Sequence, residues 1–373
     1  MKDRKRKPVV RICLTGDMNT DYRVHKTAMS LLAMGFDVVC VSRKHSHFVR
    51  AVPRAYCVVL LSTIWEKGPF FYFAYNLRLF FYLLSHRSQV VLSIDLDTLP
   101  GCALAAKIKR IPLVFDSHEY FPEVPELQHR PVIKRAWTLL EKTFVPWIDK
   151  GYTVCRSIAC IYGQKYGIDF EVVRNLPSAM KSENVKAAIH DPRFKLVYQG
   201  AVNLGRGLLE TVSALPLLDD VVLIVVGDGD IIRQVKNKVV ELDVADKVVF
   251  IGKVPFAQLA AYTASADLGL CLLENLGLNY YYSLPNRIFD FALAGVPILA
   301  SNFPEIADVV GKFRTGVLVN DLSPATIACA IEQIRCDKDT YRQISANALE
   351  VGRKLVWENE LPVLEKVYRP YLT

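Results

Sequence analysis

The sequence predicts an α/β protein of two doubly wound domains, each built on a parallel β-sheet. Short apolar runs of strand length alternate with helical patterns along most of the chain, as expected for βαβ units. The alternation stops once, in the polar segment Lys181–Lys195, and 373 residues suffice for two domains of about 150–200 residues each. We expect the two Rossmann-like domains to face each other across a cleft, because ligands bind outside the carboxyl ends of such strands.

The first domain is predicted to span residues 1–180. Its apolar runs are separated by amphipathic stretches, and right-handed crossovers between them imply a parallel sheet. The predicted strands are Val9–Leu14, Val38–Ser42, Val90–Ile94 and Leu113–Phe115, and the predicted helices cover about Tyr22–Met34, Leu99–Lys109 and Val132–Ile148.

The second domain is predicted to span residues 181–354 and repeats this architecture without repeating its sequence. Its predicted strands are Leu196–Gln199, Val221–Val226, Val248–Ile251, Leu268–Leu272 and Pro297–Ala300, and its predicted helices cover about Leu208–Leu215, Ile231–Leu242 and Asn286–Ala294. The remaining segment, 355–373, is expected to hold a helix over about Leu355–Tyr368.

The composition is that of a folded protein, with 51% hydrophobic and 23% charged residues. Nine scattered cysteines without a C-x-x-C pair indicate a reduced, cytoplasmic protein. No apolar run reaches the ~18–20 residues needed to span a bilayer, so we expect a soluble or peripheral protein. The net charge of +8 and the basic start Lys2–Lys7 suit an anionic partner such as phosphates or an acidic membrane surface; a solvated basic tail is the alternative.

The first strand of the second domain is followed by a glycine-rich turn. This turn covers Gln199–Gly207 and has Arg206 near its end. Free N–H groups at a helix start attract anions, and a guanidinium binds phosphate oxygens in a bidentate manner. An ordinary turn with a solvated arginine would look similar. The next strand ends in Gly227-Asp228-Gly229, where the glycines let a ligand approach the backbone. This short motif is informative because it lies one βα unit after the first glycine-rich turn.

The most informative segment runs from Ser283 to Pro297. Pro285 and Asn286 end a loop and open a helix, so that Arg287 and Asp290 fall on one face of its first turns. A cation for a diphosphate and a carboxylate for two ribose hydroxyls is the pair that a nucleoside diphosphate needs. A surface salt bridge would explain Arg287 and Asp290 but not the flanking Ser-Leu-Pro-Asn and Ala-Gly-Val-Pro.

With these motifs the chain resembles glycosyltransferase family 4, a large family of the GT-B fold that acts with retention of configuration. The resemblance runs in order over nearly the whole chain. It is carried by Asp116-Ser117-His118-Glu119, Tyr198-Gln199-Gly200 with Arg206-Gly207, Gly227-Asp228-Gly229, Ser283 through Asp290, and Trp357-Glu358-Asn359-Glu360.

The resemblance implies transfer of a sugar from a nucleoside diphosphate sugar, held by the second domain, to an acceptor hydroxyl, with the terminal helix crossing back to the first domain. Arg206 would contact the diphosphate, Asp290 the ribose, and the loop after Gly252 the base. The implied catalytic residues, which border the transferred sugar and the acceptor, are His118, Glu119 and Asp17. The implied donor-binding residues are Gly16, Gly200, Arg206, Gly227, Asp228, Gly229, Val254, Ser283, Leu284, Pro285, Asn286, Arg287 and Asp290.

Two positions depart from the family pattern. The first acid of the family's Glu-x7-Glu falls at Tyr282, and a basic residue five positions before Arg206 is replaced by Ala201. Neutralisation of the diphosphate would rest on Arg206, Arg287 and backbone N–H groups. Because these groups stabilise the leaving charge, we expect neither a metal nor a further cofactor. Asp95-Leu96-Asp97 resembles a metal-binding Asp-x-Asp, but carboxylates are common in such loops.

The acceptor is expected to be a glycan or a lipid-linked molecule, in assembly of cell-surface polysaccharide, lipopolysaccharide or glycolipid. The aromatic segment Phe70–Leu84, bordered by His86 and Arg87, suits a bilayer interface at the inner face of the plasma membrane. The same segment could be a helix buried on the first sheet, and one helix with two faces could be both.

Other functions remain open. A nucleotide-sugar epimerase of the same fold, or a non-catalytic nucleotide-sugar-binding scaffold, would share much of this sequence. A Rossmann dehydrogenase is disfavoured because no strand is followed by a complete Gly-x-Gly-x-x-Gly. Nucleic-acid binding is not expected, because the basic residues form no recognised signature.

Overall fold

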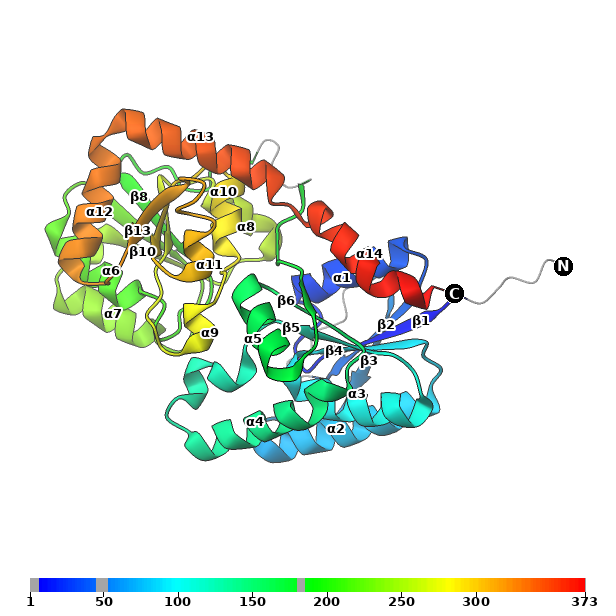
Figure 1. Cartoon of the computed structure of the whole chain (residues 1–373). Coiled ribbons are helices and arrows are strands. Elements are labelled where there is room, and N and C mark those ends of the chain that lie inside the picture. The colour runs from blue at the N-terminus through cyan, green and yellow to red at the C-terminus, as the bar shows by residue number, and fades with distance from the viewer. Residues whose placement is uncertain (1–6, 45–52, 180–184, 373) are drawn as a thin grey trace. The chain divides into compact units, whose positions relative to one another are not determined.

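The computed structural model describes residues 7–44, 53–179 and 185–372, and the chain divides into two compact units (Figure 1). Unit 1 comprises Met1–Asn175 and Glu360–Thr373, and unit 2 comprises Leu176–Asn359. Of the basic start, only Lys7 belongs to the described residues. None of the helices within the described ranges is long and apolar enough to cross a lipid bilayer.

Unit 1 is built on a seven-stranded parallel sheet in the order β3-β2-β1-β4-β5-β6-β7. Its strands are β1 (Val9–Cys13), β2 (Asp37–Arg43), β3 (Cys57–Leu61), β4 (Val90–Ile94), β5 (Leu113–Ser117), β6 (Lys150–Thr153) and β7 (Phe170–Val172). The order reverses beside β1, where Val10 pairs with Val38 on one side and with Val90 on the other. Such a switch point leaves a crevice at the carboxyl ends of β1 and β4.

Helices cover both faces of this sheet, with α1 and α14 on one face and α2, α3 and α4 on the other (Figure 1). The helices are α1 (Tyr22–Ala33), α2 (Gly68–Ser85), α3 (Asp95–Lys109), α4 (Pro131–Phe144), α5 (Arg156–Tyr166) and α14 (Leu361–Tyr368). Tyr368 of α14 is buried against Tyr152 of β6 and Phe36, and Glu360 accepts hydrogen bonds from Arg174. The chain end therefore belongs to the core of unit 1.

Unit 2 is built on a six-stranded parallel sheet in the order β10-β9-β8-β11-β12-β13. Its strands are β8 (Phe194–Gln199), β9 (Val221–Val226), β10 (Val248–Gly252), β11 (Leu268–Cys271), β12 (Ile298–Ser301) and β13 (Gly316–Val319). The switch point lies beside β8, which pairs with β9 on one side and β11 on the other.

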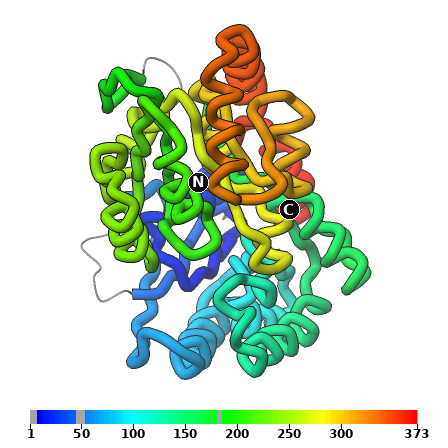
Figure 2. Tube along the Cα trace, turned by 90° about the vertical axis from the view of Figure 1, so that its left-hand side faces the viewer, coloured from blue at the N-terminus to red at the C-terminus, as the bar shows by residue number. Residues whose placement is uncertain are grey.

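Two apolar clusters cover the two faces of this second sheet. Leu223 and Val225 of β9 belong to one cluster, whereas Ile224 and Val226 belong to the other. This alternation explains why β9 is a continuous apolar run, as expected for a strand buried on both faces. The helices of unit 2 are α6 (Leu208–Ala214), α7 (Ile232–Glu241), α8 (Phe256–Thr263), α9 (Leu278–Tyr281), α10 (Arg287–Leu293), α11 (Pro304–Ala307), α12 (Pro324–Cys336) and α13 (Lys338–Lys354), and α12 packs against α13 (Figure 2).

The predicted strands and helices are present, with four differences. Helix α4 ends at Phe144, four residues before the predicted Ile148, and Val145–Trp147 forms a 3-10 turn. Helix α3 begins at Asp95, four residues before the predicted Leu99. The predicted helix over Leu355–Tyr368 begins only at Leu361, with Pro362 in its first turn, a position that suits proline. The predicted linker lies partly outside the described residues, and positions 185–193 contain no helix or strand.

Candidate active site

In unit 1, the candidate site lies at the carboxyl ends of β4 and β5. Asp116, near the end of β5, is fully buried and accepts from Arg23 of α1, with 2.7 Å between Oδ1 and Nη2 and 3.2 Å between Oδ2 and Nε. Its Oδ2 also lies 3.0 Å from Nε2 of His118. Arg23 donates in addition to the backbone oxygen of Val173. The Asp116 carboxylate thus joins α1 to the loop after β5, and Arg23 extends the network to the residue after β7.

These neighbours decide the charge of His118. Burial disfavours the imidazolium, but the carboxylates of Asp116 and Asp95 outweigh it and raise the pKa of His118 to about 9. Burial also opposes ionisation of Asp116, yet Arg23 and His118 hold the pKa of that carboxyl below its usual value. At neutral pH, His118 is therefore an imidazolium and cannot accept a proton as a general base.

The carboxylates of Asp95 and Asp97 each accept a hydrogen bond from another part of unit 1. Asp95 adopts a left-handed conformation, φ 55°, and its Oδ1 accepts from the backbone N–H of His118 at 2.7 Å. Asp97 accepts from the hydroxyl of Thr15, which follows β1, so that this bond spans the switch point. Burial raises the pKa of each carboxyl to about 6. Within the described ranges, no group of three or more His, Cys, Asp or Glu side chains is arranged to hold a metal ion.

The remaining predicted residues of unit 1 lie on the same edge of the sheet. Gly16 and Asp17 follow β1, where the Gly16 oxygen accepts from Ser42 at 2.7 Å. The Asp17 carboxylate accepts from the N–H of Asn19 at 2.9 Å, in the turn that leads into α1. Glu119 is exposed directly after His118.

In unit 2, three glycine-rich loops lie side by side after β8, β9 and β10. The N–H of Gly200 donates to Val226, the N–H of Val202 to Asp228, and the N–H of Gly227 to Gly252, at 2.9–3.0 Å. Gly227 has φ 148°, and a Cβ added there would lie 1.9 Å from the oxygen of Gly200. The loops can approach each other so closely only because glycine is present.

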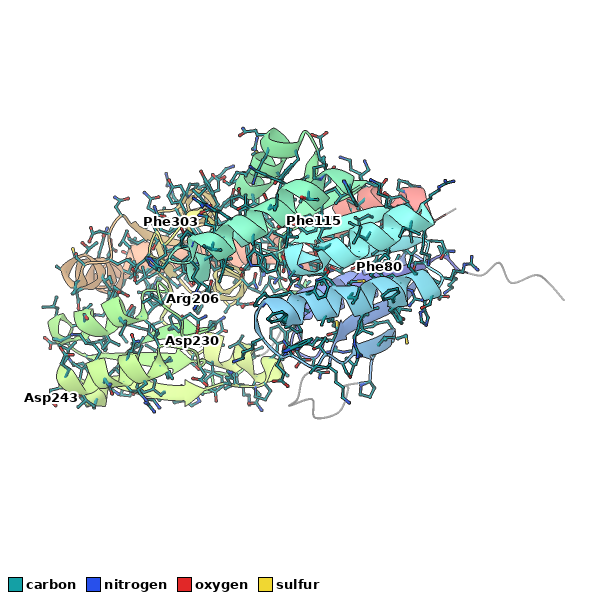
Figure 3. All side chains as sticks on the ribbon, turned by 90° about the horizontal axis from the view of Figure 1, so that it is seen from below. Phe80, Phe115, Arg206, Asp230, Asp243 and Phe303 are labelled. Carbon is teal, nitrogen blue, oxygen red and sulfur yellow. The ribbon has the colours of Figure 1, made fainter. Side chains whose placement is uncertain are left out.

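Arg206 lies in the loop after β8, close to the aromatic ring of Tyr280 in α9. Its Nε is 3.3 Å from the Tyr280 hydroxyl, and the guanidinium carbon lies 5.8 Å from the ring centroid. Arg206 is half-buried and is labelled in Figure 3. Because α6 has only seven residues, the side chain rather than a long helix dipole supplies the positive charge of this loop.

Arg287, the first residue of α10, is only 6% exposed, which is incompatible with a surface salt bridge. Its guanidinium carbon lies 4.8 Å from the ring centroid of Tyr198 in β8. Its Nη1 atom is buried and has no hydrogen-bond partner within the part of the chain that is described. Buried donors are normally paired, so this nitrogen is suited to donate a hydrogen bond to an anion.

Asp290 lies one turn further along α10. Its Oδ2 accepts from Nε2 of Gln199 at 3.2 Å, and Oε1 of Gln199 accepts from the hydroxyl of Thr263 at 2.8 Å. This chain fixes the Gln199 amide and therefore orients one oxygen of Asp290. Asp290 and Arg287 thus both contact the carboxyl end of β8, through Gln199 and Tyr198.

The other predicted donor-binding residues occupy the same edge of the second sheet. Ser283 donates to the oxygen of Tyr280 at 2.9 Å, and Leu284 packs against the second apolar cluster, as does Val254 after β10. Pro285 precedes α10. Asn286 is exposed and is the N-cap of α10, but its side chain makes no capping hydrogen bond, which differs from the usual role of asparagine at this position.

Sequence reasoning did not single out several side chains that hold the candidate site together. They are Thr15, Arg23, Thr263 and Tyr280. Tyr198 and Gln199 were named only within the motif Tyr198-Gln199-Gly200, without a role of their own. A charged residue within the core-facing pattern of a helix would have drawn attention to Arg23, because Val24, Thr27 and Leu31 of α1 are buried beside it. For Thr15, Thr263 and Tyr280, no sequence signal distinguishes them from ordinary core or loop residues.

The comparisons with known proteins agree with this geometry. The family described as "Glycosyltransferase Family 4" matches residues 22–178, and "Glycosyl transferases group 1" matches residues 193–337. A sucrose-phosphate synthase from Thermosynechococcus elongatus superposes with a TM-score of 0.78 at 16% identity, over 98% of this chain and 99% of that one. The chain belongs to glycosyltransferase family 4 and has the GT-B fold, which confirms both predictions.

Two curated relatives are similar over part of their length. A chitobiosyldiphosphodolichol beta-mannosyltransferase of Candida albicans is 25% identical over 61% of this chain and 51% of its own. A GDP-mannose-dependent alpha-(1-6)-phosphatidylinositol monomannoside mannosyltransferase of Mycobacterium tuberculosis is 29% identical over 34% of each chain. The chain thus spans about half or less of these relatives.

Proposed function

We propose that this protein transfers a glycosyl group from a nucleoside diphosphate sugar to an acceptor hydroxyl, with retention of the anomeric configuration. The observation that carries the proposal is the buried guanidinium of Arg287, whose Nη1 atom lacks a partner among the described residues at an edge lined by glycine-rich loops. A diphosphate oxygen would supply that partner. Both curated relatives carry transferase names, and one of the names specifies GDP-mannose.

The residues of unit 2 hold the donor in this proposal. Arg206 and Arg287 contact the diphosphate, the loops at Gly200 and Gly227–Gly229 bring backbone close to it, and Asp290 accepts from the ribose hydroxyls. As the sugar–phosphate bond breaks, its electron pair moves to the phosphate oxygen, and the two guanidinium groups stabilise the charge that develops there. Because cations serve this purpose, the reaction needs no metal.

The acceptor attacks the anomeric carbon from the face that the phosphate leaves. The acceptor hydroxyl loses its proton to the departing phosphate oxygen as the new carbon–oxygen bond forms, so that configuration is retained. His118 borders the transferred sugar with Glu119, Asp17 and Gly16 in this proposal. Its charge excludes a role as base and assigns it electrostatic stabilisation of the electron-rich oxygens near the reacting centre.

The acceptor is a glycan or lipid-linked hydroxyl in assembly of cell-surface polysaccharide, lipopolysaccharide or glycolipid. The names of the two relatives mention lipid-linked molecules, a diphosphodolichol in one case and a phosphatidylinositol mannoside in the other. We place the protein in the cytoplasm, in peripheral contact with the inner face of the plasma membrane through Phe70–Leu84.

The first test is calorimetric titration of wild type with UDP, GDP, ADP and CMP, repeated for Arg206→Ala, Arg287→Ala and Asp290→Ala. One nucleoside diphosphate is expected to bind, and each substitution should weaken it by more than about 1.5 kcal/mol, or roughly tenfold. Arg233→Ala, an exposed arginine of α7, is the matched control. If no nucleotide binds to folded wild type, the donor site is wrong.

Turnover is tested separately, because Tyr282 stands where the family carries its first acid, which favours a non-catalytic donor-binding scaffold as the second candidate. Incubation of the identified donor with lipid and glycan acceptors, followed by NMR of the anomeric proton, should give product of unchanged configuration. Activity that survives EDTA supports the metal-free reaction. Donor binding without transfer to any acceptor would favour the scaffold.

A further inference from the structure

The outer side of α2 carries a row of exposed apolar residues that the fold of unit 1 does not use. Phe70, Phe73, Leu77 and Phe81 are 66, 69, 45 and 59% exposed. Their spacing of three and four residues places them on one face of the helix. The buried residues Phe71, Tyr75, Leu79 and Leu83 form the core-facing side, so α2 is apolar on both sides although only one packs against the sheet.

The two neighbouring helices also carry exposed apolar residues. Leu104 and Ile108 of α3, and Val132, Ile133 and Leu139 of α4, are exposed. Helix α3 packs against both α2 and α4, and the rings of Tyr72 in α2 and Trp137 in α4 lie 5.0 Å apart. Figures 1 and 3 both show the three helices together on one side of unit 1, with Phe80 of α2 labelled in Figure 3. We call the exposed residues of these helices the α2–α4 face.

The charges of this face have a single sign. Its exposed charged residues are Arg78, Lys107, Arg135 and Lys142, with Arg110 at the C-cap of α3. All residues of the three helices are described, and none of their carboxylates is exposed. Glu141 is fully buried and pairs with Lys165, while Asp95 and Asp97 belong to the candidate site. Exposed apolar side chains gathered on three packed helices are typical of an interaction site, and the positive charge among them favours an anionic partner.

We propose that the α2–α4 face binds the surface of an anionic phospholipid bilayer. Aromatic and aliphatic side chains enter the boundary between headgroups and acyl chains, while the arginines and lysines contact the lipid phosphates. Single-sign charge around an apolar centre complements an anionic membrane. This inference rests on the peripheral membrane contact proposed above and does not depend on the transfer reaction. It extends that contact from α2 to three helices and specifies the class of lipid.

The test is sedimentation of the full-length chain with unilamellar vesicles of phosphatidylcholine alone or mixed equally with phosphatidylglycerol. Wild type should bind the mixed vesicles at least tenfold more tightly than the neutral ones, a comparison that requires no variant. Equal binding to both vesicles, or no binding to the mixed ones, would overturn the proposal.

Variants then locate the face. Phe73→Glu/Phe81→Glu should lower the partition coefficient for mixed vesicles at least tenfold, and Arg78→Gln/Lys107→Gln should lower it severalfold. Val240→Glu, at a 76% exposed valine of α7 in unit 2, is the matched control and should bind as wild type does. Undiminished binding by the double phenylalanine variant would rule the face out.

Two further measurements separate this proposal from its competitors. Nucleotide binding by Phe73→Glu/Phe81→Glu should equal that of wild type, which shows that the variant folds, whereas Arg287→Ala should lose nucleotide binding and keep vesicle binding. Sedimentation velocity tests whether a second copy of the chain, rather than a lipid bilayer, covers the α2–α4 face. If wild type dimerises and the double variant does not, the face joins two copies of the chain and the lipid proposal fails.

Discussion

Arg23 and Asp116 form a buried ion pair, with 2.7 Å between Nη2 and Oδ1 and side-chain exposures of 3% and 1%. The pair connects α1 with the end of β5 across 93 positions of sequence and leaves Oδ2 of Asp116 shared between Arg23 and His118. Charge at the candidate site of unit 1 therefore depends on a helix that contributes no predicted site residue.

Removing Arg23 should destabilise unit 1 strongly. Arg23→Met leaves a buried carboxylate without its main partner, and we expect a loss of about 3–5 kcal/mol in the free energy of unfolding, measured by urea denaturation. Arg23→Met/Asp116→Leu should recover much of this loss, because no uncompensated charge remains. Lys366→Met, which breaks a partly exposed pair with Glu171, should leave the unfolding midpoint nearly unchanged. Equal midpoints for Arg23→Met and wild type would contradict the structure.

The pKa of His118 should depend on the neighbouring carboxylates of Asp116 and Asp95. We expect its ring protons, observed by NMR, to report a pKa near 9 in wild type and a lower value in Asp116→Asn, because the charge that favours the imidazolium is gone. Asp17→Asn is the control and should leave the titration unchanged. A wild-type value at or below the ordinary 6.5 would show that the two carboxylates do not determine the charge of His118.

The same shift predicts how stability depends on pH. The folded-state pKa of His118 is raised from 6.5 to about 9, so its contribution to stability is complete below pH 6.5 and is lost as pH rises through 9. Between these values, wild type should lose stability more steeply than His118→Gln in urea denaturation at a series of pH values. Parallel curves for the two proteins would contradict this expectation.

Gly227 should tolerate no side chain. In Gly227→Ala the new methyl group would meet the oxygen of Gly200 at 1.9 Å in a backbone conformation that favours glycine, and the loops after β8 and β9 would have to separate. We expect a loss of about 2–4 kcal/mol in the free energy of unfolding and weaker nucleotide binding. Gly163→Ala, inside α5 with its nearest neighbour at 3.6 Å, should instead be neutral or slightly stabilising.

Glu360 should anchor the chain end within unit 1. Its buried carboxylate accepts from the backbone N–H, Nε and Nη2 of Arg174, and Glu360→Ala leaves these donors unpaired. Because the Arg174 side chain is about one-third exposed, we expect a moderate loss of about 1.5–3 kcal/mol by urea denaturation. Glu171→Ala removes the partly exposed pair with Lys366 and should have a much smaller effect.

Much of the fold could be predicted from the sequence because its central strands are apolar on both faces. β4, β8 and β9 lie inside their sheets. β9 is an uninterrupted hydrophobic run, and β4 and β8 are mostly hydrophobic, so all three are visible without a structure. The strands β3, β6, β7 and β13 were not predicted. β3, β7 and β13 lie at sheet edges and are largely half-buried, so their composition carries little signal. β6 lies inside its sheet, but its four residues, Lys-Gly-Tyr-Thr, form no apolar run.

The local motifs of the site were also accessible from sequence. Arg206, Arg287, Asp290 and the glycines at 200 and 227 were singled out, because glycine turns and the helix start at Asn286 are determined by residues adjacent in the chain. The structure places them on one edge of the second sheet, where the loops after β8, β9 and β10 meet.

The sequence by itself determined two parallel sheets, their order along the chain and the residue types at the carboxyl ends of their strands. Only the tertiary structure decided the charge of His118 and the burial of Arg287. Both depend on partners distant in sequence, Arg23 through Asp116 in one case and Tyr198 in the other. A side chain's pKa and its unmet hydrogen bonds are set by the dielectric and the neighbours that packing creates, and spacing along the chain contains neither.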